Sequence, residues 1–181
     1  MSQRKLLFLA TEDYFVRSHF APLVERARAD GFEVVVAARR SDAELGVRVI
    51  DMPFARGSVR IGDLLREMRA LSAVLAAEKP DVVHALSLKP ILNCLLAAGK
   101  TPQALAVTGL GYFAVSKKPA LRAVRALLAP AIRGAVAGGR AVLVVENNFD
   151  RRWVEGGKPL PDDRVFLMPG AGVDPDQFKA S

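Results

Sequence analysis

Residues 80–113 contain the feature that most constrains the fold. Two short apolar runs, 81–84 and 104–107, flank an apolar segment with helical spacing at 91–98. A strand, a helix and a second strand in this order form the βαβ unit of a parallel sheet. In such sheets the ligand binds beyond the carboxyl ends of the strands. The sequence therefore predicts a ligand site made from the polar and glycine residues that follow these two runs: His84, Ser87, Lys89, Thr108, Gly109 and Gly111.

The same alternation extends along the whole chain. Further strand patterns occupy 5–10, 32–38, 47–52, 141–145 and 165–168, and further helical patterns occupy 14–30, 61–78, 121–136 and 148–155. Pro130 lies within one helical pattern, where a proline is expected to kink the helix or restart it. We therefore predict an α/β fold, a doubly wound, mostly parallel Rossmann-like sheet of about seven strands. This domain would span 1–168, and residues 169–181 would begin a linker.

The positive charge is concentrated in one part of the chain. The 181 residues carry a net charge of +7, yet no Asp or Glu occurs between Val82 and Val145. Such a segment is expected to face an anionic partner: phosphate groups, nucleic acid or an anionic membrane surface. An ordinary solvated basic face is the alternative. The basic residues of this segment are Lys89, Lys100, Lys117, Lys118, Arg122, Arg125, Arg133 and Arg140.

Several common site motifs are missing from the sequence. The residues after the first strand include no glycine, which argues against a dinucleotide site, and no phosphate loop of the NTPase type occurs. There is no Cys/His cluster for zinc and no Gly-x-Ser-x-Gly nucleophile turn. Cys94, the single cysteine, is expected to be a reduced core thiol. We therefore expect no metal, no cofactor and a cytoplasmic protein.

Polar residues also follow two other strands of the predicted sheet. Glu12, Asp13 and His19 follow the first strand, and Glu146 and Asn147 follow the sixth. Carboxylates and imidazoles at such an edge could bind sugar hydroxyls or transfer a proton. Simpler structural roles compete with this interpretation. The two acidic residues after the first strand could cap the helix, and the histidine of that helix could pack on its face. His84 could likewise be a capped strand end.

The order of these motifs resembles the N-terminal half of a family 4 glycosyltransferase, the two-domain GT-B type, and within it the capsule-type members. Two positions depart from the family pattern, because Ala171 stands where serine is usual and Phe20 where arginine is common. The matching residues are Asp13, Tyr14 and Phe15, then Ser18 and His19, Gly31 with Val34, residues 79–84 with Ser87, Lys89 and Pro90, residues 108–111, Asn147, and residues 170–174 with Phe178.

The resemblance implies a retaining, metal-independent enzyme that transfers a hexose-type sugar from a nucleotide sugar. The acceptor would be a polyprenyl-diphosphate-linked saccharide in bacterial capsule, lipopolysaccharide or glycan biosynthesis. Most donor contacts would come from a C-terminal domain, so we expect these residues alone to be inactive. By this resemblance the catalytic residues are His84 and Asp13; the acceptor-binding residues are Glu12, His19, Ser87, Lys89, Thr108, Gly109 and Gly111; and the interdomain hinge residues are Gly172 and Asp174.

The resemblance also implies peripheral association with the inner membrane from the cytoplasmic side. Apolar side chains next to lysines are typical of interfacial binding. The membrane and diphosphate surface would consist of Tyr112, Phe113, Lys117, Lys118, Arg122 and Arg125. Two alternatives remain: a non-catalytic, membrane-anchoring half of a split transferase, and a basic nucleic-acid-binding domain. The second is disfavoured and no nucleic-acid partner is expected, because the few aromatic residues are not interleaved with the basic ones.

Overall fold

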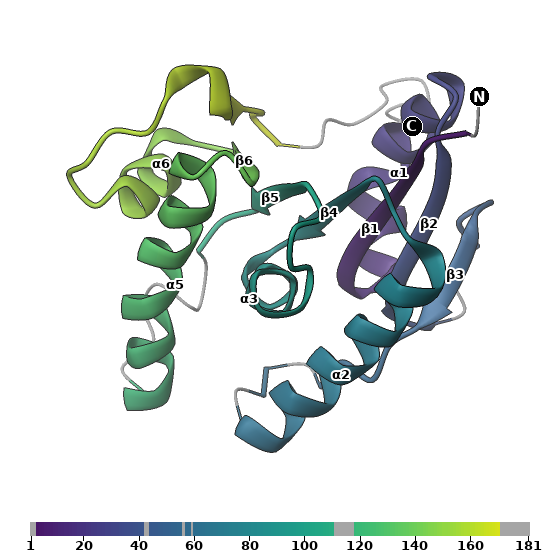
Figure 1. Cartoon of the computed structure of the whole chain (residues 1–181), viewed down its shortest axis with the longest axis horizontal. Coiled ribbons are helices and arrows are strands. Elements are labelled where there is room, and N and C mark those ends of the chain that lie inside the picture. Colours follow the sequence, from purple (N-terminus) through teal and green to yellow (C-terminus); the bar gives the residue numbers. More distant parts are fainter. Residues whose placement is uncertain (1–2, 42–43, 56, 59, 111–117, 171–181) are drawn as a thin grey trace, which may run out of the picture.

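The computed structural model describes residues 3–41, 44–55, 57–58, 60–110 and 118–170. In it, seven strands form one sheet in the order β3-β2-β1-β4-β5-β6-β7, and every neighbouring pair is parallel (Figure 1). The predicted doubly wound α/β sheet is confirmed. The strands are β1 (Lys5–Glu12), β2 (Glu33–Arg39), β3 (Arg48–Asp51), β4 (Val82–Leu86), β5 (Gln103–Val107), β6 (Ala141–Val145) and β7 (Val165–Leu167).

Helices cover both faces of the sheet. The α-helices are α1 (Asp13–Ala29), α2 (Ile61–Glu78), α3 (Leu88–Ala97), α5 (Pro119–Ala137) and α6 (Asn148–Glu155), with a short 3₁₀ helix, η1 (Asp162–Arg164), before β7. α1 packs on one face, whereas α3 lies between α2 and α5 on the other (Figure 1). Among the described residues, none of the helices has the length and apolar character needed to cross a membrane.

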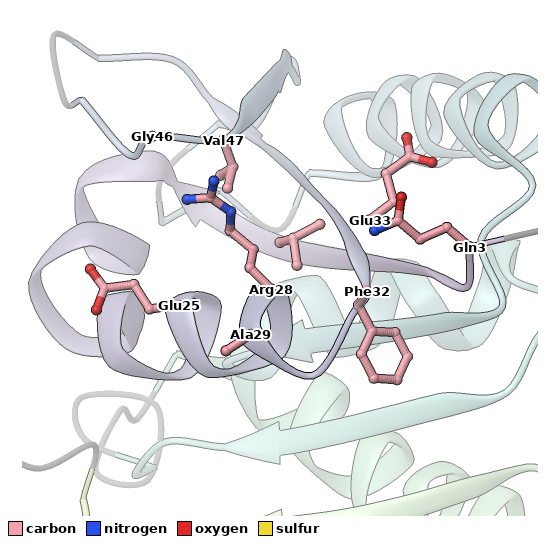
Figure 2. A pocket seen from close by; sticks show the side chains of 9 residues that line it. Gln3, Glu25, Arg28, Ala29, Phe32, Glu33, Gly46 and Val47 are labelled. Carbon is pink, nitrogen blue, oxygen red and sulfur yellow. The ribbon is translucent and has the colours of Figure 1, made fainter.

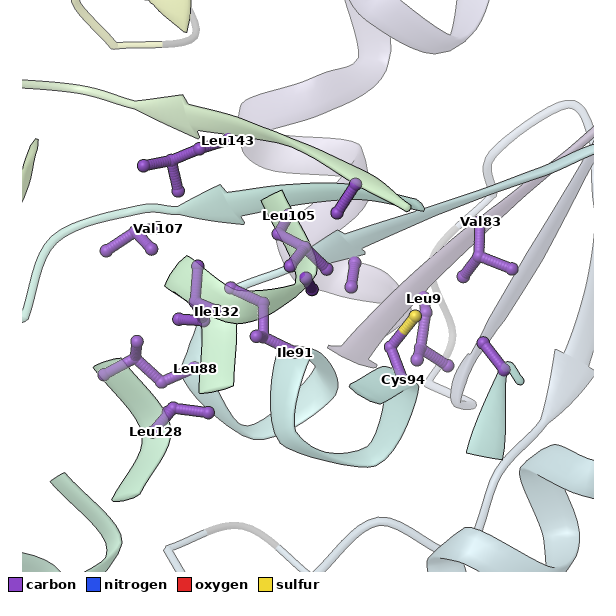
Figure 3. Close-up of a cluster of buried hydrophobic side chains, with 14 of the residues drawn as sticks. Leu9, Val83, Leu88, Ile91, Cys94, Leu105, Val107, Leu128, Ile132 and Leu143 are labelled. Carbon is purple, nitrogen blue, oxygen red and sulfur yellow. The ribbon is translucent and has the colours of Figure 1, made fainter. Parts of the chain in front are cut away.

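The two faces follow from the alternation of side chains along each strand. In β4, Val83 and Ala85 join the larger core under α3, while Leu86 joins the smaller core under α1. Figure 3 shows the larger core, in which Cys94 lies among leucine, isoleucine and valine side chains. Burial raises the pKa of the Cys94 thiol to about 12. This agrees with the predicted core thiol.

Several boundaries differ from the predicted ones, and some of them move candidate site residues; α3, for example, begins at Leu88 and so includes Lys89. β1 continues to Glu12 and α1 begins directly at Asp13, so these residues do not form a loop. β4 continues to Leu86, because the apolar residues after His84 still pair with β5. α5 passes through Pro130 as one helix, since this proline lies on the solvent side, where water can satisfy the freed carbonyl.

The predicted linker falls almost entirely outside the described residues. Only Pro169 and Gly170 of the range 169–181 are described, so the boundary at 168 stays a prediction. The hinge residues Gly172 and Asp174 also lie outside the described part of the chain.

Candidate functional site

A cleft of about 580 Å³ opens at the carboxyl edge of the sheet. Its walls come from the end of β1, from α1, α2, α3 and α5, and from the short segments after β3 and β5. The strand order reverses between β1 and β4: β2 and β3 follow on one side, and β5 to β7 on the other. A doubly wound sheet normally holds its ligand at this point. Six predicted site residues line this cleft together: Glu12, His19, Ser87, Lys89, Thr108 and Gly109.

The cleft is lined by apolar and polar side chains together. The apolar side chains of α3 and α5 are called the apolar wall, and polar residues from three strand ends and α1 also line the cleft, as do Tyr14 and Phe15 of α1. A cavity of this kind suits a ligand with a hydrocarbon part and a hydrophilic part. The apolar wall consists of Leu88, Leu92, Leu121, Val124 and Leu128.

Ser87 has an unusual backbone conformation at the base of the cleft. Its φ of 76° and ψ of 166° lie in a region that essentially only glycine adopts without strain. Two hydrogen bonds hold it there: its N–H donates to the Ala106 carbonyl (2.9 Å), and its carbonyl accepts from the N–H of Ile91 (3.0 Å). This conformation turns the chain from β4 directly into α3. The N–H groups of Leu88 and Lys89, which have no partner within the helix, therefore begin α3 beside the cleft.

Lys89 is held by a carboxylate that the sequence analysis missed. Glu67 of α2 is fully buried, and its Oε1 lies 2.7 Å from the Lys89 ammonium. The same oxygen accepts the N–H of Ala55 (2.9 Å), while Oε2 accepts from Asn93 Nδ2 (3.2 Å). The sequence could have indicated this role of Glu67. It lies three residues after Leu64 and four before Leu71, so a charged residue shares a helix face with two leucines.

His19 lies on the exposed side of α1, at the rim of the cleft. Its Nδ1 is 2.6 Å from the Ser18 hydroxyl, and its ring packs at 4.8 Å from that of Phe15, measured between centroids. Burial and the nearby Asp150 raise the pKa of Glu146, an effect that the charge of His19 partly opposes. The imidazole of His19, which follows β1, thus lies near the carboxyl group of Glu146, which follows β6.

The two acidic residues after the core of β1 differ in exposure. Glu12 lines the cleft and forms an ion pair with Arg39. Asp13 is fully buried, does not line the cleft, and accepts a hydrogen bond from the N–H of Ser41 (3.0 Å). Its position in the first turn of α1 also favours a negative charge, as the capping alternative expected. The catalytic role of Asp13 stays a prediction.

The predicted position of His84 after its strand is wrong. The residue lies inside β4, is 8% exposed, and packs on Phe8 with the ring centroids 5.2 Å apart. Burial lowers the pKa of His84 to about 4, so the imidazole is neutral at pH 7. It does not line the cleft. A catalytic role for His84 stays a prediction.

The buried imidazole of His84 should make the stability of the protein fall in mild acid. Its folded-state pKa of about 4 lies below the ordinary value of 6.5, so the unfolded chain binds the proton more readily between these values. The free energy of unfolding should therefore fall by up to ~3 kcal/mol as pH drops from 6.5 to 4. Urea unfolding at several pH values measures this. In His84→Leu the decrease should be smaller by that amount; an equal decrease in both proteins would contradict the assignment.

The described part of the predicted membrane and diphosphate surface lies at the start of α5. Lys118 and Arg122 are exposed, Arg125 is partly buried, and Leu127 is 72% exposed. Leu121, Val124 and Leu128 of the same helix line the cleft, on the face adjacent to these basic residues. The predicted residues Gly111, Tyr112, Phe113 and Lys117 lie outside the described residues.

A second hollow of about 620 Å³ lies at the opposite edge of the sheet, between the end of α1 and the start of β2. Figure 2 shows Arg28 and Glu25 on α1 and Phe32 before β2 around this hollow. It contains none of the predicted site residues. Within the described residues, there is also no group of three or more His, Cys, Asp or Glu side chains able to hold a metal ion.

The family of the chain is shown by a model described as "Glycosyl transferase 4-like", which matches residues 5–146. The chain belongs to the glycosyl transferase 4-like family. This family domain has the fold of larger proteins with solved structures. One is a glycosyltransferase from Rickettsia africae, with a TM-score of 0.62 and 14% identity over 93% of this chain and 43% of that one.

Two further solved structures contain ligands. UDP-GlcNAc 2-epimerase from Neisseria meningitidis, bound to UDP-GlcNAc, matches with a TM-score of 0.61 and 14% identity over 91% of this chain and 46% of that one. HepE from Anabaena, in complex with UDP and glucose, matches with a TM-score of 0.57 and 14% identity over 98% and 47%. These likenesses show the fold, and the glycosyl transferase 4-like chain spans less than half of each protein. No curated protein matches its sequence.

Proposed function

We propose that this chain is the acceptor-side part of a retaining, metal-independent glycosyltransferase. It would help to transfer a hexose-type sugar from a nucleotide sugar to a polyprenyl-diphosphate-linked saccharide in bacterial surface polysaccharide or glycan biosynthesis. The observation that carries this proposal is the cleft, because α5 supplies part of its apolar wall and carries basic residues on an adjacent face. Membership of the glycosyl transferase 4-like family supports the transferase activity.

Each wall of the cleft matches one part of such an acceptor. The leucine-rich wall of α3 and α5 would contact the first isoprene units. Lys89 and the N-terminus of α3 would bind the diphosphate, because a helix N-terminus and an ammonium group both favour negative charge. Glu12, His19 and Thr108 would hydrogen-bond to sugar hydroxyls. Gly109, with a φ of 83°, would let the backbone approach the ligand closely.

The donor would be bound mainly by a second domain. UDP and UDP-GlcNAc occupy structures that share this fold but are about twice as long as the matched part. In the complete enzyme the reaction centre would lie between the two domains, near the carboxyl edge of this sheet. Asp13 and His84 would act there through the elements that they stabilise, the start of α1 and the end of β4.

We further propose that the protein is cytoplasmic and binds peripherally to the inner membrane. The first half of α5 would lie against an anionic bilayer with Lys118, Arg122 and Arg125, together with Lys117 before it. This orientation would bring the lipid chain of the acceptor to the adjacent face of the same helix, where the cleft opens.

Filling the apolar wall should test the acceptor proposal. Val124→Trp would place a large ring in the cleft, and the affinity of the chain for farnesyl diphosphate should fall about tenfold or more, because the ring displaces the isoprenoid. Calorimetric titration measures the affinity. Ala123→Trp is the matched control, since Ala123 is exposed and does not line the cleft. If the wild-type chain does not bind farnesyl diphosphate, or if both variants bind it equally, the proposal fails.

A further inference from the structure

We propose that Glu67 is a positioning residue that holds the Lys89 ammonium at the cleft. This inference rests on the proposed function, because it concerns how the same cleft would recognise the diphosphate of its acceptor. Glu67 does not line the cleft, whereas Lys89 does. The carboxylate would therefore act on the ligand through the lysine.

The contacts around the ion pair leave the ammonium little freedom. Its Nζ lies 2.7 Å from Glu67 Oε1 and donates a hydrogen bond to the carbonyl oxygen of Ala55. An ammonium has three donors, so one remains for a ligand when these two partners are in place. The Lys89 side chain is 19% exposed, while the Glu67 side chain is fully buried. The pair thus presents one cationic donor to the cleft in a fixed direction.

The same carboxylate also connects the cleft wall to α2. The N–H of Ala55 donates to Glu67 and the carbonyl of Ala55 accepts from Lys89, so the ion pair binds both polar groups of one residue. Ser58 follows in the cleft wall, and its hydroxyl donates to Asp63 of α2 (2.6 Å). The ion pair therefore also holds the neighbouring segment of the cleft wall.

The substitution Glu67→Gln removes the charge and keeps the shape. Its carbonyl oxygen can still accept from Ala55. Its amide can donate to Asn93 Oδ1 once the Asn93 amide turns over, which gives up the hydrogen bond from Asn93 Nδ2 to the Lys89 carbonyl. The fold should therefore persist. Without the opposite charge, the Lys89 ammonium is held less firmly beside Ala55 and turns toward solvent, so the diphosphate would lose its fixed cation.

Two measurements on Glu67→Gln test the inference. Acylation of Lys89 by acetic anhydride, followed by mass spectrometry relative to the exposed Lys158, should become several-fold faster than in the wild type. The affinity for farnesyl diphosphate should fall about tenfold. Glu78→Gln is the matched control, because Glu78 is an ion-paired carboxylate at the other end of α2 and should change neither value.

The outcomes separate this inference from the proposed function. Unchanged acylation of Lys89 would overturn the role of Glu67, even if the affinity falls, because a general structural effect would then explain the loss. Faster acylation with weaker binding supports the role. If the wild-type chain binds no farnesyl diphosphate, the acceptor proposal is overturned, and the acylation rate alone still decides whether Glu67 holds Lys89.

Discussion

Replacement of Glu67 by alanine should lower the free energy of unfolding by about 3–5 kcal/mol, because it leaves a largely buried ammonium and a backbone N–H without their shared acceptor. Urea unfolding followed by circular dichroism measures the change. Glu67→Gln should cost only about 1 kcal/mol, since it keeps an acceptor for the Ala55 N–H. Glu67→Gln removes only the charge, whereas Glu67→Ala removes the charge and the acceptor oxygens. The difference between their free energies of unfolding therefore measures the contribution of the acceptor oxygens.

A matched control and a rescue make the stability prediction sharper. Glu25→Ala removes an exposed carboxylate from α1 and should change the free energy by less than about 0.5 kcal/mol. Adding Lys89→Met to Glu67→Ala should restore part of the stability, because no charge then remains in the site. If Glu67→Ala unfolds at the same urea concentration as the wild type, the buried ion pair does not stabilise the fold.

Neutralising the basic surface at the start of α5 should nearly abolish binding to anionic vesicles. Each basic residue near such a surface contributes about 1 kcal/mol, so changing Lys117, Lys118, Arg122 and Arg125 to glutamine should weaken partitioning roughly a thousandfold. Sedimentation with vesicles of phosphatidylglycerol and phosphatidylcholine measures the bound fraction. Binding by the wild type should also weaken with added salt, because the attraction is screened.

A second variant with the same loss of charge distinguishes a local surface from net charge. It would carry glutamine at four exposed basic positions elsewhere: Arg69, Lys79, Arg152 and Lys158. This variant should keep most of the vesicle binding. Equal losses in both variants would show that only the net charge matters, and undiminished binding by the α5 variant would refute the proposed membrane surface.

The alternation of strands and helices could be predicted because most of the apolar runs are short and are followed by a helix-length pattern. The exception between β2 and β3 was also visible, since 40–46 has no helical spacing. The ends of individual strands were harder to predict. The polar character of His84 suggests a strand end, yet its packing on Phe8 and its pairing with Ala104 keep it in β4.

The candidate cleft could be predicted in part, for a reason of geometry. Parallel strands end at one edge, so residues after β1, β4 and β5 had to approach each other, and Glu12, Ser87 and Thr108 do so. Glu67 could not be placed in the same way. Its partners Lys89 and Ala55 belong to other elements, and only the packing of α2 against α3 brings them together.

The strand order also determines when the sheet can form during synthesis. β1 lies in the interior of the sheet, yet its second neighbour, β4, follows only after β2, β3 and α2. Leu6 pairs with Val82, so a nascent chain that has not reached β4 exposes one edge of a strand that is apolar at residues 6–10. Pairing β1 with β4 brings together two strands that are far apart in the sequence, and such non-local contacts slow folding. Until then, β1 is the segment that a ribosome-bound chaperone would be expected to protect.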